Sequence, residues 1–302
     1  MGVHRRGGWR VLGEEHVTHR PAWLKVKAPS PRSAEGMRTI REVLSRYRLT
    51  TVCQGAICPN AAECWAEETA TFMILGKVCT RACRFCAVPT GHPDGIVDWK
   101  EPARLAAAVE ELGLSYVVLT SVDRDDLADG GASLFAKTIA MIKECRPSTK
   151  VEALVPDFTE NKGPIREVSD AGAHVIGHNL ETVKRLTPQL RDRRAGYEQS
   201  LRVLARFKEL APNRVLKSSL ILGLGERRGE VLAALRDLRT AGVDAVTLGQ
   251  YLRPTPRSVP VARYLSPAEF DELAESARDM GFRFVVSGPL VRSSYHAAEL
   301  LQ

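Results

Sequence analysis

Short apolar runs recur along the chain from about residue 71, and longer stretches between them carry an apolar residue every three to four positions. Runs of four to eight mostly apolar residues are typical of strands that are buried on both faces of a parallel sheet. We therefore expect seven strands, at residues 71–78, 115–120, 150–155, 174–177, 215–222, 245–248 and 282–286.

The stretches between these runs predict amphipathic helices, because their apolar residues fall on one helical face. The best marked helix follows Ser266, which can cap it, with Pro267 in the first turn, Glu269 completing a capping box and Gly281 after its end. Four further faces consist of Leu105, Val109 and Leu112; Phe135, Ile139 and Ile142; Tyr197, Leu201 and Leu204; and Val231, Leu235 and Leu238.

Alternating strands and helices predict an α/β fold with a parallel sheet. Six strand–helix units favour a partial (β/α)6 barrel of the TIM-like type, since a complete eight-unit barrel needs about 250 residues. An open, doubly wound sheet is the alternative topology. We expect an N-terminal extension (1–70), the barrel (71–286) and a C-terminal tail (287–302).

The composition is that of a soluble globular protein, with 44% hydrophobic and 26% charged residues. The net charge is +7, but 43 basic residues are offset by 36 acidic ones, so the charge favours an acidic partner only weakly. No apolar run approaches the length that spans a membrane. We expect no membrane partner.

Six of the seven cysteines form two trios of different spacing, between positions 53 and 86. A tetrahedral zinc or a four-iron cluster normally takes four protein ligands. Each trio therefore needs a distant fourth ligand or leaves one metal coordination position open for chemistry. The trios are Cys53, Cys58 and Cys64, in a C-x4-C-x5-C pattern, and Cys79, Cys83 and Cys86, in a C-x3-C-x2-C pattern.

Disulfides are disfavoured by the length of the chain, its odd number of cysteines and the absence of an apolar segment at its start. Zinc sites usually repeat C-x2-C pairs, whereas thiolates in other spacings suit iron–sulfur clusters. Reduced cysteines imply a cytoplasmic protein. The first twenty residues are Arg-rich but contain Glu14 and Glu15, which disfavours a transit peptide. We expect Cys145 to be a small buried residue on a helix.

Polar motifs follow the predicted strands, at the ends where α/β folds place their active sites. Each motif alone has a plainer interpretation: GLGE as a turn, Asn179 as a helix cap, and the aspartates 123, 125 and 126 as a solvated turn. Together, after a cysteine loop, they favour a site. They are VCTRACRFCAV, TSVDRDD, PDF, HNLET, GLGE and QYLRPT.

The C-x3-C-x2-C loop after a first barrel strand resembles the signature of radical S-adenosylmethionine (SAM) enzymes. The resemblance implies that Cys79, Cys83 and Cys86 bind three irons of a 4Fe-4S cluster, whose fourth iron chelates adenosylmethionine. An electron from the cluster then breaks a bond of the sulfonium, and the resulting radical takes hydrogen from an unactivated C–H. Phe85 would cover the cluster, or alternatively would be a core aromatic residue.

The second trio narrows the resemblance, because TVCQGAICPNAAECW followed by ATFMILG resembles the lipoyl synthase family. The similarity extends through almost the whole chain. Further segments that match that family are RPAWLKVKAP, TSVDRDDLADGGA, VPDF, HNLETV, GLGE, QYLRPT, PVARY and GPLVRSSYHA.

This resemblance implies an auxiliary 4Fe-4S cluster on Cys53, Cys58, Cys64 and Ser294, which is consumed as the sulfur donor. It implies sulfur insertion at C6 and C8 of an octanoyl group, with two adenosylmethionines used per lipoyl group formed. The octanoyl group is carried on a lysine of a carrier domain, from 2-oxoacid dehydrogenase complexes or the glycine-cleavage H protein. A low-potential donor such as ferredoxin or flavodoxin supplies electrons. Arg292 either holds the serine oxygen or forms a surface salt bridge.

Our candidates for holding adenosylmethionine are Thr120, Ser121, Asn179 and Glu181. Glu181 can accept hydrogen bonds from the amino group or ribose, and its plainer interpretation is a favourable charge near a helix start. We expect His178 to be structural.

The chain also departs from the family pattern. Lys-Ser-Gly is replaced by 217–219 (Lys-Ser-Ser), and GLGE is followed by Arg227 where threonine is common. Arg257 and Ser258 occupy a loop in which the family often has histidine, so we expect different substrate contacts there.

Two alternative functions remain open. Another sulfur-inserting radical enzyme, similar to biotin synthase or to the methylthiotransferases, would leave a different number of added sulfurs on its substrate. A zinc-stabilised module that binds nucleic acid would need aromatic residues interleaved with basic ones. Aromatic residues make up only 6% of the chain and the charges are mixed, so we expect no nucleic-acid partner.

Overall fold

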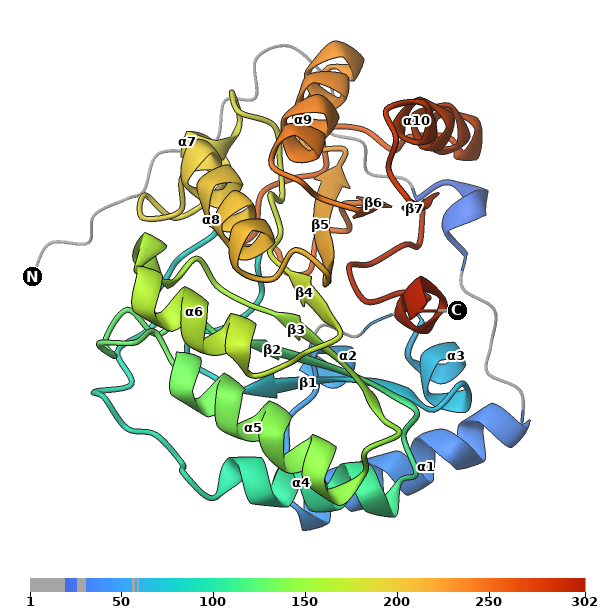
Figure 1. The fold of residues 1–302 in the computed structure, drawn as a ribbon. Helices are drawn as coiled ribbons and strands as arrows, with labels where there is room; N and C mark the ends of the chain where they lie inside the picture. Colours follow the sequence, from blue (N-terminus) through green and yellow to red (C-terminus); the bar gives the residue numbers. More distant parts are fainter. Residues whose placement is uncertain (1–19, 26–30, 56–57, 59, 302) are drawn as a thin grey trace, which may run out of the picture.

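A computed structural model describes residues 20–25, 31–55, 58 and 60–301, and all structural statements concern these residues. Seven strands form one sheet in the order of the chain, and every neighbouring pair is parallel (Figure 1). The strands are β1 (Thr69–Ile74), β2 (Tyr116–Ser121), β3 (Lys150–Leu154), β4 (Val175–Gly177), β5 (Val215–Leu222), β6 (Ala245–Gln250) and β7 (Phe284–Gly288).

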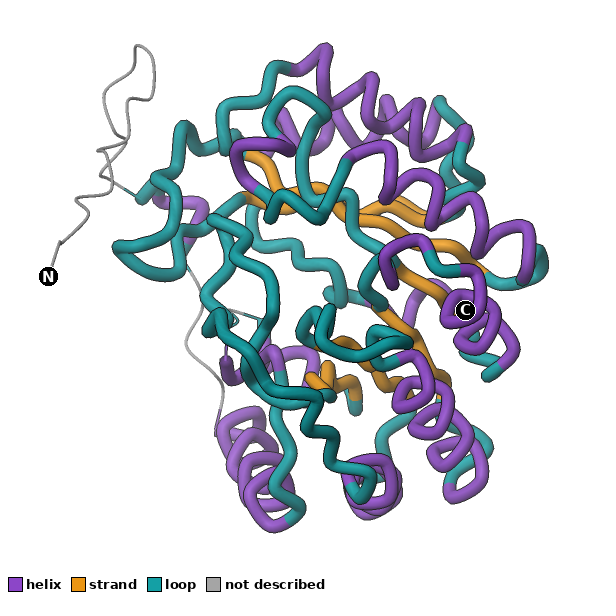
Figure 2. Tube along the Cα trace, turned by 90° about the vertical axis from the view of Figure 1, so that its left-hand side faces the viewer, coloured by secondary structure: helices purple, strands orange, loops and turns teal. Residues whose placement is uncertain are grey.

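Helices follow the strands and lie around the outside of the sheet, while loops gather over the face turned to the viewer in Figure 2. Parallel strands in chain order with external helices confirm the partial barrel and rule out a doubly wound sheet, in which the strand order reverses. The main helices are α4 (Glu101–Glu111), α5 (Ala132–Cys145), α6 (Lys162–Asp170), α8 (Tyr197–Leu210), α9 (Arg228–Thr240) and α10 (Pro267–Asp279).

The predicted helix faces form the outer part of the core. Most of the residues predicted on these faces are almost completely buried, whereas Leu112 and Leu201 are only partly buried. Helix α10 begins as predicted: the Ser266 hydroxyl accepts a hydrogen bond from the Glu269 N–H at 3.3 Å, and the Glu269 carboxylate accepts one from the Ser266 N–H at 2.9 Å. The helical period therefore located four outer helices, and the capping box located the start of the last one.

The first strand is shorter than predicted, because it ends at Ile74 and not at residue 78. Leu75 and Gly76 have φ of 67° and 91°, so the chain turns sharply there. The turn is fixed because the Leu75 N–H donates to the carboxylate of Glu101 at 3.0 Å. The remaining residues, 77 and 78, belong to the cysteine loop.

Two other features differ from expectation. Helix α6 carries Ile165 and Val168 in the core, but its short, interrupted apolar pattern gave no prediction. The prediction that Cys145 is buried was wrong, because this residue ends α5 and is exposed.

Three helices that precede β1 in the chain lie beside the edge of the sheet at this strand. They are α1 (Pro31–Arg46), α2 (Val52–Gly55) and α3 (Ala61–Ala66). Thr51 pairs with Phe72 of β1 in an isolated bridge. The C-terminal η3 (Ala297–Leu301) lies near α3 in Figure 1, and the Asn60 side chain donates to the carbonyl of Leu290 at 2.7 Å. The described segment before β1 and the segment after β7 therefore meet at this edge.

Among the described residues, no helix is long and apolar enough to cross a membrane. All but the last of the first twenty residues, which were considered as a transit peptide, lie outside the described residues.

Candidate active site

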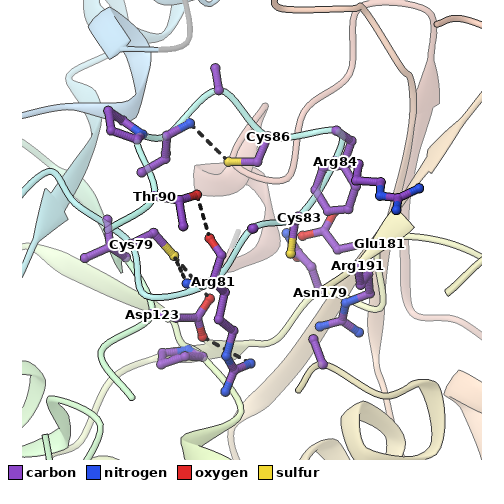
Figure 3. Close-up of a pocket in the computed structure, with 18 of the residues that line it drawn as sticks. Cys79, Arg81, Cys83, Arg84, Cys86, Thr90, Asp123, Asn179, Glu181 and Arg191 are labelled. Atoms are coloured by element: carbon purple, nitrogen blue, oxygen red, sulfur yellow. Dashed lines mark hydrogen bonds and ion pairs between the residues drawn. The ribbon is translucent and has the colours of Figure 1, made fainter. Parts of the chain in front are cut away.

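A cavity of about 860 Å³ opens at the carboxyl ends of the strands (Figure 3). Its walls come from the cysteine loop after β1, the ends of β2, β3 and β4, and the loop after β6. Eight of the residues predicted for the site line it together: Cys79, Cys83, Phe85, Cys86, Thr120, Ser121, Asn179 and Glu181.

Each sulfur of the loop trio accepts one backbone N–H. Cys79 accepts from Arg81 at 3.4 Å and Cys86 from Val88 at 3.4 Å, both within the loop. Cys83 accepts from Asp192 at 3.3 Å, across 109 positions of the chain. Hydrogen bonds to sulfur favour the thiolate form, which is the form that binds metal. The donor set therefore fits an iron–sulfur cluster.

Burial raises the pKa of Cys79 to about 11 and that of Cys83 to about 12. Both side chains are therefore neutral thiols near pH 7 unless a metal displaces the proton. Among the described residues, no three His, Cys, Asp or Glu side chains form a group that could hold a single metal ion.

Arg81, between the first two loop cysteines, ties the loop to the ends of β2 and β3. Its guanidinium is 3% exposed and makes ion pairs with Asp125 at 2.7 Å and Asp157 at 2.6 Å, and a longer one with Asp123 at 3.3 Å. Burial alone would raise the pKa of Asp125 and of Asp157. The hydrogen bonds and the charge of Arg81 outweigh burial and hold both pKa values below the usual value. Ion pairs of Arg81 with three buried or half-buried aspartates thus hold the cysteine loop in place.

The aspartates after β2 are therefore not a solvated acidic turn. Asp126 pairs with the buried Arg124 at 2.8 Å, and this hydrogen-bonded contact lowers the pKa of Asp126 to about 2. Asp123 faces the cavity, where burial raises its pKa to about 6 although Arg81 opposes the shift. This loop serves to position the cysteine loop.

Two polar atoms on the cavity wall have no hydrogen-bond partner among the described residues. They are the hydroxyl of Ser121 and Nε of Arg191, and both are buried. Arg191 is anchored at its other end, where Nη1 donates to the hydroxyl of Ser200 at 2.8 Å. Unsatisfied buried polar atoms cost free energy, so they indicate a polar ligand. A hydroxyl and a guanidinium fit the carboxylate of adenosylmethionine.

Glu181 adopts φ of 69°, in the left-handed region that non-glycine residues rarely occupy. Its backbone bridges toward β5, accepting from the Ile221 N–H at 2.8 Å and donating to the Ser219 carbonyl at 3.0 Å. Burial raises the pKa of Glu181, whereas Arg191 and a hydrogen bond from Asn179 act in the opposite direction. Strained residues cluster at ligand sites, which supports a role for Glu181 in binding.

The plainer interpretations of HNLET are not supported. In the described chain the next helix after β4 is α7 (Thr187–Leu190), so neither Asn179 nor Glu181 begins a helix. His178 is structural, as expected: its ring nitrogens bond to the Val155 carbonyl and the Ser200 hydroxyl, both at 2.9 Å. Burial lowers the pKa of His178 to about 4, so its ring is neutral near pH 7.

The second trio lies at the edge of the sheet, on α2, α3 and the segment between them. Burial raises the pKa of Cys64 to about 12, and the charges of Cys58 and Cys53 act in the same direction, which places the three sulfurs within electrostatic range of one another. Burial also raises the pKa of Cys53 and of Cys58. Hydrogen bonds from the backbone N–H groups of Thr71 to Cys53 and of Asn60 to Cys58 partly offset these two shifts. Three half-buried thiols, two of them supported by backbone N–H groups, again fit a cluster.

The C-terminal tail packs against this trio on both sides of Ser294. The Tyr295 hydroxyl donates to Glu63 at 3.1 Å, next to Cys64 in the sequence. Burial raises the pKa of Cys58 and the charge of Arg292 opposes this shift, so the guanidinium lies within electrostatic range of that sulfur. Arg292 also donates to the Gln250 carbonyl at 3.3 Å. Arg292 makes no ion pair with a carboxylate among the described residues, contrary to the surface salt bridge that was the alternative.

Arg191 and Asp192 were missed by the sequence analysis. They lie in a segment, 190–194, that follows HNLET by about ten residues and contains no motif. The repeated arginines at 191, 193 and 194 are the only signal, and the sequence does not show which of them faces inward.

The fold and the site together define a radical SAM enzyme. The family model described as "Radical SAM superfamily" matches residues 73–238. Methylornithine synthase (PylB) aligns with a TM-score of 0.54 at 14% identity over 82% of this chain and 81% of its own. The FeFe-hydrogenase maturase HydG from Carboxydothermus hydrogenoformans aligns with a TM-score of 0.56 at 13% identity, over 89% and 78%. At such identities these structures show the fold alone.

Curated relatives are much closer in sequence. The lipoyl synthase of Thermus thermophilus is 54% identical over 98% of this chain and 91% of its own length, and that of Pyrobaculum arsenaticum is 56% identical over 93% and 95%. The chain belongs to the lipoyl synthase family.

Proposed function

We propose that the protein inserts two sulfur atoms, at C6 and C8, into an octanoyl group carried on a lysine of a lipoyl carrier protein. The observation that carries the proposal is the presence of two separate cysteine trios, one in the central cavity and one beside the C-terminal tail. A radical SAM enzyme that only abstracts hydrogen needs the first trio alone. The second trio supports sulfur insertion.

In this proposal Cys79, Cys83 and Cys86 hold the first 4Fe-4S cluster, and Cys53, Cys58, Cys64 and Ser294 hold the auxiliary one. When bound, the first cluster and adenosylmethionine supply the radical that abstracts hydrogen, and the auxiliary cluster supplies the sulfur.

The protein's own side chains bind and orient. Ser121 and Arg191 line the cavity and each keeps a polar atom without a partner, so they can hold the methionine carboxylate of adenosylmethionine. Glu181, with Asn179 beside it, offers oxygens to the amino group or ribose, and Thr120 lies next to Ser121 on the same wall. Phe85 adds an apolar surface that helps to exclude water from the reacting carbon.

Arg292 has a role at the second site. Its guanidinium lies within electrostatic range of Cys58. In the sequence, Arg292 precedes Ser294 by two residues. A fixed positive charge there favours an anionic oxygen on the serine. The carriers we propose are those of 2-oxoacid dehydrogenase complexes and the glycine-cleavage H protein, with a ferredoxin or flavodoxin as electron donor.

The test is mass spectrometry of an octanoyl-lysine peptide after anaerobic incubation with reconstituted protein, adenosylmethionine and dithionite. Two added sulfurs, with two 5′-deoxyadenosines formed per product, are expected. One inserted sulfur, or a methylthio group, would assign the chain to the biotin-synthase-like or methylthiotransferase alternatives. A preparation with iron and sulfide for only one cluster would contradict the proposal.

A further inference from the structure

The loop between β6 and α10 forms one wall of the cavity and contains a tight turn over residues 255–258. The Ser258 N–H donates to the Thr255 carbonyl at 3.0 Å, which closes the turn. Pro256 occupies the first central position, where its fixed φ favours a turn, and Arg257 occupies the second. The Thr255 hydroxyl accepts from the Arg257 N–H at 3.3 Å and bonds to the Ser258 hydroxyl at 3.0 Å. The conformation of the turn is therefore fixed locally.

The turn is also fixed relative to the cysteine loop. Arg253 Nε donates to the Ser258 carbonyl at 2.9 Å, and the buried Tyr251 hydroxyl donates to the Val259 carbonyl at 2.8 Å. The Val259 N–H donates to the carbonyl of Arg84, between Cys83 and Cys86, at 3.0 Å. A side chain at the tip of the turn thus has a defined position with respect to the first cluster.

Arg257 is that side chain. It is exposed and lines the cavity, and its guanidinium has no ion pair or hydrogen bond with any described residue. Arg81 and Arg191, which also line the cavity, are buried, and each is held by side-chain contacts within the protein. Arg257 alone of these three presents its charge at the solvent-facing rim, where it can meet an anion that arrives from outside.

The substrate of the proposed reaction brings an anionic group to this rim through the protein that carries it. An octanoyl-lysine is a long, apolar arm, whereas the carrier domain that bears it is too large for a cavity of about 860 Å³. The arm must therefore enter while the carrier backbone stays at the mouth. Residues next to the acylated lysine are then the ones that meet the rim.

We infer that Arg257 is a specificity-determining residue, which recognises a carboxylate side chain within two positions of the acylated lysine in the carrier. A net charge of +7 favours an acidic partner over the whole surface, but Arg257 converts that general preference into a local one at the mouth. The inference rests on the proposed function, since it concerns the same substrate.

The experiment compares two octanoyl-lysine peptides that differ only in one flanking residue, Asp or Asn. Binding is measured by fluorescence anisotropy of labelled peptides, and turnover by mass spectrometry, for the wild type, Arg257→Gln and Arg257→Glu. A solvent-exposed ion pair is worth up to about 1 kcal/mol, so the wild type should prefer the Asp peptide about fivefold, mainly in Kd and KM. The ratio of the two affinities should fall to about one in Arg257→Gln and should reverse, in favour of the Asn peptide, in Arg257→Glu.

The matched control is Arg283→Gln, which removes the same charge from an exposed arginine at the amino end of β7, away from the cavity. It should keep the wild-type preference. Equal binding of both peptides by the wild type, or a preference that survives Arg257→Gln, would overturn the inference. The proposed function fails by a different result, which is the absence of added sulfur in both peptides whatever their affinities.

Discussion

Asp192 donates its backbone N–H to the sulfur of Cys83, which lies 109 positions earlier in the chain, at 3.3 Å. The Asp192 carboxylate accepts a hydrogen bond from the Ala82 N–H at 3.0 Å. Two positions earlier, the Leu190 carbonyl accepts one from the Arg84 N–H at 2.7 Å. Arg194 adds a hydrogen bond to the Thr80 carbonyl at 2.5 Å. Segment 190–194 therefore clamps the cysteine loop, and it also carries Arg191 into the cavity.

The first prediction concerns this N–H. Asp192→Pro removes it, and the extended ψ of 162° at Arg191 is compatible with a following proline. A hydrogen bond to sulfur stabilises the more negative, reduced cluster, so its loss should lower the reduction potential. A net hydrogen bond of about 1 kcal/mol corresponds to about 40 mV for one electron. The measurement is an EPR-monitored redox titration of the first cluster.

The control for this titration is Asp192→Ala, which loses the carboxylate but keeps the N–H. The difference in potential between the two variants isolates the hydrogen bond to Cys83. Equal potentials would show that the N–H has no influence on the cluster.

The second prediction concerns the free guanidinium atom of Arg191. Arg191→Gln should raise the Kd for adenosylmethionine about tenfold or more, because a charge-assisted contact to a carboxylate in a buried setting is worth about 1.5–3 kcal/mol. Isothermal titration calorimetry of the reconstituted protein measures this. Arg193→Gln, at the exposed arginine two positions later, should bind with unchanged affinity. A similar loss in both variants would mean that only net charge matters.

Arg191 and Asp192 also mark the limit of what the sequence could predict. The parallel sheet followed from short apolar runs, and the cavity followed from the polar motifs after them, because both signals are local. The contact of Asp192 with Cys83 is made by a backbone N–H, which every residue but proline carries, so no residue type could reveal it. The turn at Leu75 was missed because it depends on a carboxylate 26 positions later. The pairing of the tail with the second trio came from family resemblance alone.

The third prediction concerns Ser294. Ser294→Ala should lower the iron content of the auxiliary site and abolish sulfur insertion, while adenosylmethionine cleavage continues at the first cluster. Iron and sulfide analysis with product mass spectrometry tests both. Ser293→Ala removes the neighbouring hydroxyl and should keep both activities. If the two variants behave alike, Ser294 has no special place at the cluster.

The fourth prediction concerns the buried charge of Arg81. Removing one partner of a buried ion pair costs about 3–5 kcal/mol, since the other charges stay buried and unpaired. Arg81→Met should therefore lower the free energy of unfolding by about that amount, measured in urea on the metal-free protein. Arg194→Gln, whose side chain is 38% exposed and also contacts Asp125, should cost less than about 1 kcal/mol. Comparable losses would show that Arg81 is not the centre of this network.

The last prediction concerns the pH dependence of stability at the start of α9. Hydrogen bonds from Arg185 at 2.7 and 2.9 Å lower the pKa of Glu230 from 4.5 to about 2. A lowered carboxyl pKa stabilises the fold above pH 4.5, and this contribution disappears as the pH falls toward 2. Because Arg185 is 46% exposed, solvent screening reduces the gain to about 1 kcal/mol.

Glu230→Gln keeps an acceptor for the Arg227 N–H but loses the charge. It should be about 1 kcal/mol less stable than the wild type at pH 6, with the difference vanishing near pH 2, in urea unfolding of the metal-free protein. Glu272→Gln is the matched control, since its contact with Arg228 is 3.7 Å long and exposed on both sides, so it should change stability at neither pH. A difference for Glu230→Gln that stays constant from pH 6 to pH 2 would assign its effect to the helix cap rather than to the ion pair, because only the ion pair depends on ionisation of Glu230.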